Sequence, residues 1–383
     1  MHISDDIRYI GVNDHHIDLF ESLYAVPDGV SYNSYVILDE KTAVLDPVDE
    51  HCTTAWMDNL RQALRGRLPD FLIVHHMEPD HSANVVSFMN AYPSATVVAS
   101  AKAFEMMRGF FGQDYADHRI IVKDGDHLSL GRHRLRFFSA PMVHWPEVMI
   151  SYDALEQTLF SADAFGRFGA LDVPQPWNDE ARRYYFGIVG KFGASVQQLL
   201  RKIAALPLQR ICPLHGPVLT APLEPYLRLY DRWSAYIPES DGVAIAYASV
   251  YGHTRRVAEL LADKLRQRSV TAVLHDLARC DMAAAMADAF RYPNLVLAST
   301  TYNGDVFPPM RTFLHGLVTR NYRNRQVFLI ENGSWSPASA GVMQTMLEPC
   351  SGLVFPHDTL RILSTHTPDT LHQLDALADL LAP

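Results

Sequence analysis

The chain has 383 residues, of which 48% are hydrophobic and 20% charged, a composition typical of a soluble globular protein of about two domains. Its net charge of −10 excludes the basic field that attracts nucleic acid, and no apolar run is long enough to cross a membrane. The first residues show no secretion signal and the four cysteines form no C-x-x-C pair, so we expect a cytoplasmic protein without a rubredoxin-type or zinc-ribbon site.

Up to about residue 235, short strand-like runs alternate with helix-like stretches, and we expect one domain over residues 1–238. Strands are predicted at residues 34–38, 43–45, 71–74, 96–99 and 135–138, and helices at 53–65 and 83–90. Residues 149–152 and 158–160 are predicted to pair as a hairpin.

The segment 236–242 combines Pro, Ser, Asp and Gly and is the best candidate for a linker to a second domain over residues 239–383. Strands are predicted there at residues 243–247, 271–274, 295–298, 327–330 and 360–363, with helices at 254–267, 282–290, 308–319, 338–348 and 370–381. Five strands that alternate with helices indicate an α/β, doubly wound parallel sheet.

The segment after the buried strand at 71–74 is the richest in possible metal ligands, which are His76, Glu78, Asp80 and His81. Two imidazoles and two carboxylates at one strand end indicate a metal site. Glu78 stands where a zinc hydrolase of similar pattern would usually have histidine, which favours iron over zinc. Asp80 could instead serve only as a helix cap. The neighbouring His75 should point to the opposite face of the strand, and we predict that it is structural.

Three later strand ends each add one possible ligand, namely His144, Asp163 and His215. Taken singly, each would more often be a surface, capping or turn residue. Taken together, seven ligands suit two metals that share one bridging carboxylate and that each keep an open position.

The strand at 243–247 runs into a loop with hydroxyl groups and then into a helix, and the free N–H groups of a helix start form a phosphate cradle. Two more loops, after the third and fourth strands, each offer glycine for close approach and one aromatic ring for stacking, although these rings could be merely exposed. The candidate cofactor-binding residues are Ser249, Val250, Tyr251, Gly252, His253, Thr254, Thr300, Thr301, Tyr302, Asn303, Gly304, Asn332, Gly333, Ser334 and Trp335. The pattern G-x-G-x-x-G is absent, which disfavours NAD.

The order and spacing of the seven ligands resemble the metallo-β-lactamase-like αββα sandwich, and S-x-Y-G-x-T at residues 249–254 resembles the FMN phosphate loop of flavodoxins. With Glu78 among the ligands and the segment 30–35 at the entry, the whole chain resembles the flavodiiron proteins, also called A-type flavoproteins. That resemblance implies FMN in the second domain and two irons in the first. One iron would be held by His76, Glu78 and His144, the other by Asp80, His81 and His215, and Asp163 would bridge them.

The resemblance implies an oxidoreductase that reduces dioxygen to water, nitric oxide to nitrous oxide, or both, at a diiron centre fed by FMN. It also implies a head-to-tail homodimer or a dimer of dimers. Because the chain ends at Pro383, soon after the last predicted helix, we expect a separate electron donor such as rubredoxin or a reduced deazaflavin.

The preference between the two gases stays open, and Tyr24, Tyr184 and Tyr185 are unranked candidates for groups near the substrate. Some relatives carry a histidine near the substrate in the segment that holds Tyr24. Ala25 follows Tyr24 here, so a proton donor at that place would have to come from elsewhere.

Two other functions are compatible with the same residues. A binuclear zinc hydrolase fused to a flavin module would use the ligands to activate water, although Glu78 argues against it. A non-catalytic electron carrier with a vestigial first domain is the other, and the full set of seven ligands argues against it.

Overall fold

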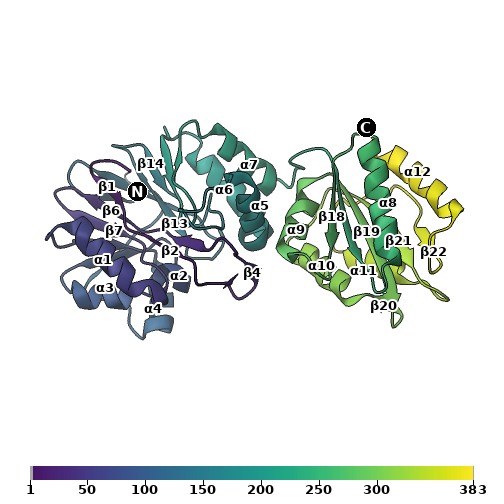
Figure 1. Cartoon of the computed structure of the whole chain (residues 1–383). Helices are drawn as coiled ribbons and strands as arrows, with labels where there is room; N and C mark the ends of the chain where they lie inside the picture. Colours follow the sequence, from purple (N-terminus) through teal and green to yellow (C-terminus); the bar gives the residue numbers. More distant parts are fainter. Residues whose placement is uncertain (1–2, 383) are drawn as a thin grey trace. The chain divides into compact units, whose positions relative to one another are not determined.

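The computed structural model describes residues 3–382, which form two compact units that divide between Asp231 and Arg232 (Figure 1). This division falls within helix α7 (Glu224–Ser234), a few residues before the expected linker. Among the described residues, no helix is both long enough and apolar enough to cross a membrane.

The first unit is built on two six-stranded sheets. The first sheet has the order β1 (Ile7–Tyr9), β6 (Tyr35–Leu38), β7 (Thr42–Leu45), β8 (Phe71–Ile73), β9 (Thr96–Ala99) and β10 (Arg119–Ile121). The second sheet has the order β11 (His127–Ser129), β12 (Arg134–Ser139), β13 (Met149–Asp153), β14 (Thr158–Phe160), β15 (Arg210–Cys212) and β16 (Leu219–Thr220). Two small sheets pair β2 (Val12–Asp14) with β5 (Val30–Tyr32) and β3 (Leu19–Phe20) with β4 (Tyr24–Ala25).

The two large sheets pack face to face around one apolar core. Ile37 and Ile73 of the first sheet lie in the same buried cluster as Phe137 and Phe160 of the second. Figure 1 shows the helices of this unit on the outer sides of the sheets. These helices are α1 (Thr53–Leu64), α2 (Pro79–Ser82), α3 (Val85–Ala91), α4 (Ala101–Phe111), α5 (Trp177–Tyr184), α6 (Gly193–Ile203) and α7, with a π-helical turn at Tyr185–Val189 and short 3-10 turns at Glu50–Cys52 and Gly190–Phe192. The expected αββα sandwich is therefore confirmed.

The second unit is a parallel sheet with the order β18 (Ala272–Asp276), β17 (Val243–Ala248), β19 (Asn294–Tyr302), β21 (Gln326–Asn332) and β22 (Leu360–Ile362), and β20 (Asp305–Val306) pairs antiparallel with the end of β19. Helices α8 (His253–Gln267) and α12 (Pro368–Leu381) bury apolar side chains in one core cluster with β17. The remaining helices are α9 (Met282–Arg291), α10 (Pro308–Thr319) and α11 (Ser339–Leu347). The strand order is that of a flavodoxin-like doubly wound sheet, as predicted.

Most predicted elements agree with the structure to within two residues, and the strand expected at 295–298 differs most, because β19 continues to Tyr302. The helix expected at 83–90 begins only at Val85, because residues 79–82 already form the separate short helix α2. The strand expected at 271–274 extends to Asp276, where it still pairs with Tyr247 of β17.

Candidate metal centre and flavin site

The end of β8 and the short helix α2 deliver the first four candidate ligands. Glu78 occupies the N-cap position of α2 and Pro79 its first turn, so the chain turns sharply between His76 and Asp80. The backbone N–H of His81 donates to the carbonyl of Glu78 at 2.9 Å, which fixes this turn. No side chain makes a cap hydrogen bond in this described helix, so the reading of Asp80 as only a helix cap was wrong.

Seven side chains converge at this place in two groups. The first group is His76, Glu78, His144 and Asp163, and the second is Asp80, His81 and His215. In the first, His144 Nε2 lies 3.0 Å from Glu78 Oε2 and 3.3 Å from His76 Nε2. In the second, His81 Nε2 lies 2.9 Å from His215 Nε2 and 3.2 Å from Asp80 Oδ2. The structure therefore brings together all seven residues that the sequence singled out.

Asp163 lies between the two groups and faces each with a different oxygen. Its Oδ2 is 3.2 Å from His76 Nε2 and 3.1 Å from His144 Nε2. Its Oδ1 is 3.3 Å from His81 Nε2 and 3.7 Å from His215 Nε2. One carboxylate can thus serve both groups at once.

The hydrogen bonds of this cluster leave buried oxygen atoms unsatisfied. Both carboxylate oxygens of Asp80 and Oδ1 of Asp163 receive no hydrogen bond from any residue between 3 and 382. Buried carboxylate oxygens without a donor are costly, and a cation at the centre would satisfy them. The donor set of imidazoles and carboxylates fits iron.

The electrostatics of the cluster indicate the same need for positive charge. Burial alone would raise the pKa of Asp163, but the surrounding imidazoles hold it well below its ordinary value. Burial alone would lower the pKa of His144, but Asp163 and Glu78 raise it to about 9. The buried carboxylates therefore favour positive charge at this place, and metal ions would supply it.

Two of the imidazoles are oriented from behind by groups that the sequence did not reveal. Glu147 is buried, and its Oε1 lies 2.8 Å from His76 Nδ1 and accepts the backbone N–H of Met77 at 2.9 Å. His215 Nδ1 lies 2.9 Å from the carbonyl of Ser31. Both contacts leave the Nε2 atom to face the cluster. Nothing marks Glu147 in the sequence except its place three residues after His144.

His75 has the structural position predicted for it. It is buried, with Nδ1 2.5 Å from Asp46 Oδ2 and Nε2 2.8 Å from Ser151 Oγ, so its ring ties β7 and β8 to the second sheet. Its side chain takes no part in either ligand group.

The three tyrosine candidates have different surroundings. Tyr184 packs against His215 with ring centroids 5.5 Å apart, and burial together with the charges of nearby carboxylates raises its pKa well above the ordinary value. The hydroxyl of Tyr24 donates to the carbonyl of Gly187 at 2.8 Å. The ring of Tyr185 packs on Tyr230 at 5.2 Å. Of the three, Tyr184 has the strongest link to the cluster.

Glu21 was not predicted, and it lies in the turn between β3 and β4, three residues before Tyr24. Loss of solvent around its carboxyl group, and then the negative charge of Glu78, raise its pKa to about 8. Glu21 is exposed to solvent and lies in the segment where Ala25 left the question of a proton donor open.

The predicted flavin residues line one cavity of about 730 Å³ at the carboxyl ends of β17, β19 and β21. Every predicted residue lines it except Gly252, and Ser336, Ala338 and Ser364 line it in addition. Gly252 instead makes the turn possible, with φ of 91° and its N–H donated to Ser249 Oγ at 3.1 Å. The rings of Tyr251 and Trp335 are 90% and 92% exposed, which leaves their faces free for a planar ligand.

The three loops around this cavity are joined beneath it by a polar network. Thr254 Oγ1 lies 2.8 Å from Thr300 Oγ1, and the side-chain amide of Asn332 donates to Thr254 Oγ1 at 3.3 Å. The backbone N–H of Ser364 donates to Asn332 Oδ1 at 3.1 Å. Asn332 thereby fixes the loop after β22, which the sequence did not assign to the site.

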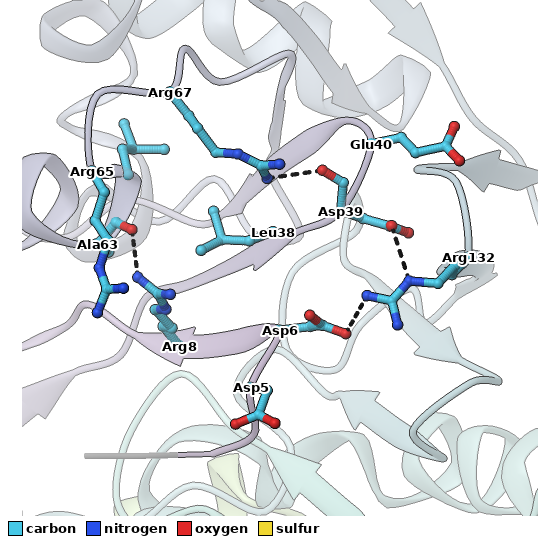
Figure 2. A pocket seen from close by; sticks show the side chains of 11 residues that line it. Asp5, Asp6, Arg8, Leu38, Asp39, Glu40, Ala63, Arg65, Arg67 and Arg132 are labelled. Carbon is cyan, nitrogen blue, oxygen red and sulfur yellow. Dashed lines mark hydrogen bonds and ion pairs between the residues drawn. The ribbon is translucent and has the colours of Figure 1, made fainter.

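A different cavity, of about 540 Å³, lies at the opposite end of the first sheet, beside the turns that precede β7 and β8 (Figure 2). Figure 2 shows that Arg8, Arg67 and Arg132 interact with other groups that line the cavity. Arg132 pairs with Asp6 at 2.7 Å and with Asp39 at 3.5 Å, and Arg8 donates to the carbonyl of Ala63 in the last turn of α1 at 2.7 Å. These contacts cap a helix and close a turn, so this cavity has a structural explanation.

Comparison with known proteins matches both units of the chain. Residues 30–216 match the ODP family beta lactamase, and residues 244–346 match the flavodoxin domain. The anaerobic nitric oxide reductase flavorubredoxin of Salmonella arizonae is 27% identical over 90% of this chain and 74% of its own length. The putative diflavin flavoprotein A 2 of Synechocystis is 32% identical over 69% of this chain and 46% of its own length.

Solved structures share the whole fold. The flavodiiron protein of Giardia intestinalis aligns over 100% of this chain and 98% of its own, with a TM-score of 0.91 and 22% identity. The rubredoxin oxygen:oxidoreductase of Desulfovibrio gigas aligns over 100% of this chain and 97% of its own, with a TM-score of 0.91 and 24% identity. With both domains matched in this order, the chain belongs to the flavodiiron proteins, a family of oxidoreductases with a diiron centre and FMN.

Proposed function

We propose that this protein reduces dioxygen to water, nitric oxide to nitrous oxide, or both, at two irons supplied with electrons by FMN. The observation that carries the proposal is the position of Asp163, whose two oxygens face two separate groups of ligands. A shared carboxylate is the usual means of holding two metals roughly 3.5–4 Å apart, which is the spacing that clamps a small substrate.

We assign His76, Glu78 and His144 to one iron, Asp80, His81 and His215 to the other, and Asp163 to both. The unsatisfied oxygens of Asp80 and Asp163 support this assignment, because a cation would satisfy them. Carboxylates in both groups favour iron, whereas a zinc hydrolase would more often use histidine at the place of Glu78.

When bound, the irons and FMN supply the electron transfer to the gas. The side chains of this protein orient and shield the centre. Glu147 and the carbonyl of Ser31 hold the rings of His76 and His215 so that Nε2 faces the centre. Phe20 packs edge-on against His215 at 5.2 Å, and Tyr184 packs on it from another direction at 5.5 Å, so apolar surface borders this side of the centre.

Reduction of either gas consumes protons. Two side chains beside the cluster, Tyr184 and Glu21, are candidates to donate them. Burial raises the pKa of Tyr184, which keeps its hydroxyl protonated. Loss of solvent around its carboxyl group and the nearby Glu78 raise the pKa of Glu21 to about 8, which favours its protonated form. We propose Glu21 and Tyr184 as the groups that supply a proton at the rim of the centre.

We further propose a cytoplasmic head-to-tail homodimer, or a dimer of such dimers, that takes electrons from a separate donor such as rubredoxin or a reduced deazaflavin. Two relatives support rubredoxin, because their names join it to nitric oxide reductase and to oxygen:oxidoreductase activity. Free cysteines, four in the chain, fit a reducing compartment.

The test is gas consumption by protein reduced under anaerobic conditions, with iron and FMN quantified in the same sample and reduced rubredoxin as donor. We expect uptake of dioxygen, nitric oxide or both, lost in His144→Ala and kept in His118→Ala, which changes an exposed histidine of the same unit. The ratio of the two rates gives the preferred gas. Uptake of neither gas by a sample that contains both cofactors would refute the reductase and direct attention to hydrolytic substrates.

A further inference from the structure

A group of possible metal ligands lies outside the proposed diiron centre, where the end of β2 meets the start of α1. It consists of Asp14, His51 and Cys52, and one ligand atom of each lies within 4.8 Å of the others. Asp14 and Cys52 are 3% and 7% exposed, whereas the side chain of His51 is 52% exposed. None of the three belongs to the ligand set that we assign to the irons, so the group needs an account of its own.

The carboxylate of Asp14 is held so that one of its oxygens faces the histidine. Its Oδ1 accepts two backbone N–H groups of the following turn, at 2.8 and 3.3 Å, and its Oδ2 lies 2.6 Å from His51 Nε2. On the other side of the ring, His51 Nδ1 lies 2.5 Å from Asp49 Oδ1. A carboxylate behind one ring nitrogen orients a histidine so that the other nitrogen can bind a metal.

The thiol of Cys52 is the part of the group that an ordinary ion pair between Asp14 and His51 leaves unexplained. It is buried beside that pair, and it makes no hydrogen bond within residues 3–382. Burial, together with the negative charges of Asp14 and Asp49, raises the pKa of Cys52 to about 12, so both carboxylates act on the sulfur. A cation bound to the thiolate would compensate these negative charges.

We propose that Asp14, His51 and Cys52 form a second metal site, separate from the diiron centre, that binds Zn²⁺. Zinc accepts thiolate, imidazole and carboxylate ligands, whereas the sulfur disfavours the hard ions Mg²⁺ and Ca²⁺. A tetrahedral zinc holds its ligand atoms roughly 3.3–3.6 Å apart, so the three atoms have to close by about 1.5 Å at most. The exposed side of the histidine leaves the fourth position to water. Binding releases the thiol proton and the proton between Nε2 and Oδ2.

The proposed zinc site joins two segments that support the first unit. Asp14 belongs to β2, and β2 pairs with β5, whose Ser31 carbonyl lies 2.9 Å from His215 Nδ1. The histidine and the cysteine belong to the turn that leads into α1. A metal that binds only the folded arrangement stabilises it by mass action, so zinc should raise the melting temperature.

The test is X-ray absorption at the zinc edge, on the full chain with iron and FMN bound and one equivalent of Zn²⁺ added. Zinc–sulfur bonds of about 2.3 Å are distinguishable from bonds of about 2.0–2.2 Å to nitrogen or oxygen. No cysteine is among the residues that we assign to iron, so zinc that enters the iron centre gives no sulfur signal. The variants are Cys52→Ser and His51→Gln, and the control is Cys350→Ser, which alters a half-buried cysteine of the other unit.

We expect the unaltered protein and Cys350→Ser to retain one zinc with one sulfur neighbour after gel filtration. Cys52→Ser should lose the sulfur signal. Both Cys52→Ser and His51→Gln should lose the retained zinc and the rise in melting temperature that zinc causes in the unaltered protein.

Zinc bound without a sulfur neighbour would overturn the inference, and so would no zinc retained by the unaltered protein, a sulfur signal that persists in Cys52→Ser, or one that is lost in Cys350→Ser. If Cys52→Ser fails to fold, His51→Gln decides the question, because it changes a half-exposed side chain and leaves the buried thiol in place. Full retention of zinc by His51→Gln would refute the site. Neither gas enters this measurement, so its outcome does not depend on the proposed function.

Discussion

Glu147 should be the most informative single position behind the metal centre. It is buried, and one of its oxygens receives both the His76 ring N–H and the Met77 backbone N–H. Glu147→Ala leaves those two donors buried without an acceptor, at about 1–3 kcal/mol each, so the combined cost is about 2–6 kcal/mol. Glu147→Gln keeps the shape and one acceptor oxygen, but it loses the charge that makes the imidazole a stronger ligand.

We therefore expect Glu147→Gln to fold and to bind iron at the His76 position roughly 10–100-fold more weakly, as is usual when a carboxylate behind a ligating histidine is changed. At about 1.4 kcal/mol per tenfold, this is a loss of about 1.4–2.8 kcal/mol in binding. Glu147→Ala should lose iron and also unfold at lower temperature.

The assay is a competition between the protein and a chromophoric chelator for iron, with thermal unfolding of the metal-free protein measured in parallel. Glu105→Gln, which alters an exposed carboxylate of the same unit, should match the unaltered protein in both measurements. Retention of two irons by Glu147→Gln at the unaltered affinity, with unaltered gas uptake, would show that Glu147 does not orient His76 for metal binding.

The remaining predictions concern a turn, the flavin cavity and a histidine far from iron. Gly216→Ala should lower both the melting temperature and the iron content, because Gly216 has φ of 77° and the added Cβ would collide with Arg167. An unchanged melting temperature together with unchanged iron content would contradict this account of the loop. Trp335→Leu should weaken FMN binding roughly 3–10-fold in a fluorescence titration, since a stacked ring contributes about 0.5–1.5 kcal/mol, and unchanged affinity would exclude stacking by Trp335. Burial alone would lower the pKa of His133, but hydrogen bonds to Asp153 and Asp6 raise it. The contact of protonated His133 with these carboxylates therefore stabilises the fold fully below the ordinary histidine pKa of about 6.5. This stabilisation is lost as the pH rises through the raised pKa. The difference in melting temperature between the unaltered protein and His133→Gln, both measured without metal, should accordingly be larger at pH 5.5 than at pH 9, and a difference that grows with pH would contradict the sign.

The sequence was most informative where several ligands follow a strand end. The strands β8, β14 and β15 are short, and a possible metal ligand stands three residues after the end of each. Carboxyl ends of neighbouring strands lie at the same edge of their sheets, so the residues after them meet in space. For that reason His76, Asp163 and His215 could be predicted to share one site.

The parts that could not be predicted lack such a signal. The strands β1 to β5 have only two or three residues each, too few to show a period of two. Glu21 lies in a turn between two of them and becomes a possible proton donor only because the turn brings it beside Glu78. Ser364 enters the flavin site because Asn332 binds its backbone, and a backbone contact leaves no mark on residue type.

Arg167 and Glu147 show why burial is the deciding information that a sequence lacks. In the sequence, each is a charged residue in a loop, and most such residues are solvated. In the structure, Glu147 has its charge compensated by His76, while Arg167 has no carboxylate partner among the described residues. Water screens a solvated charge within a few ångströms, whereas a buried charge acts on every ionisable or metal-binding group around it. Glu147 should therefore influence how tightly iron is held, because its carboxylate lies against the ring of His76.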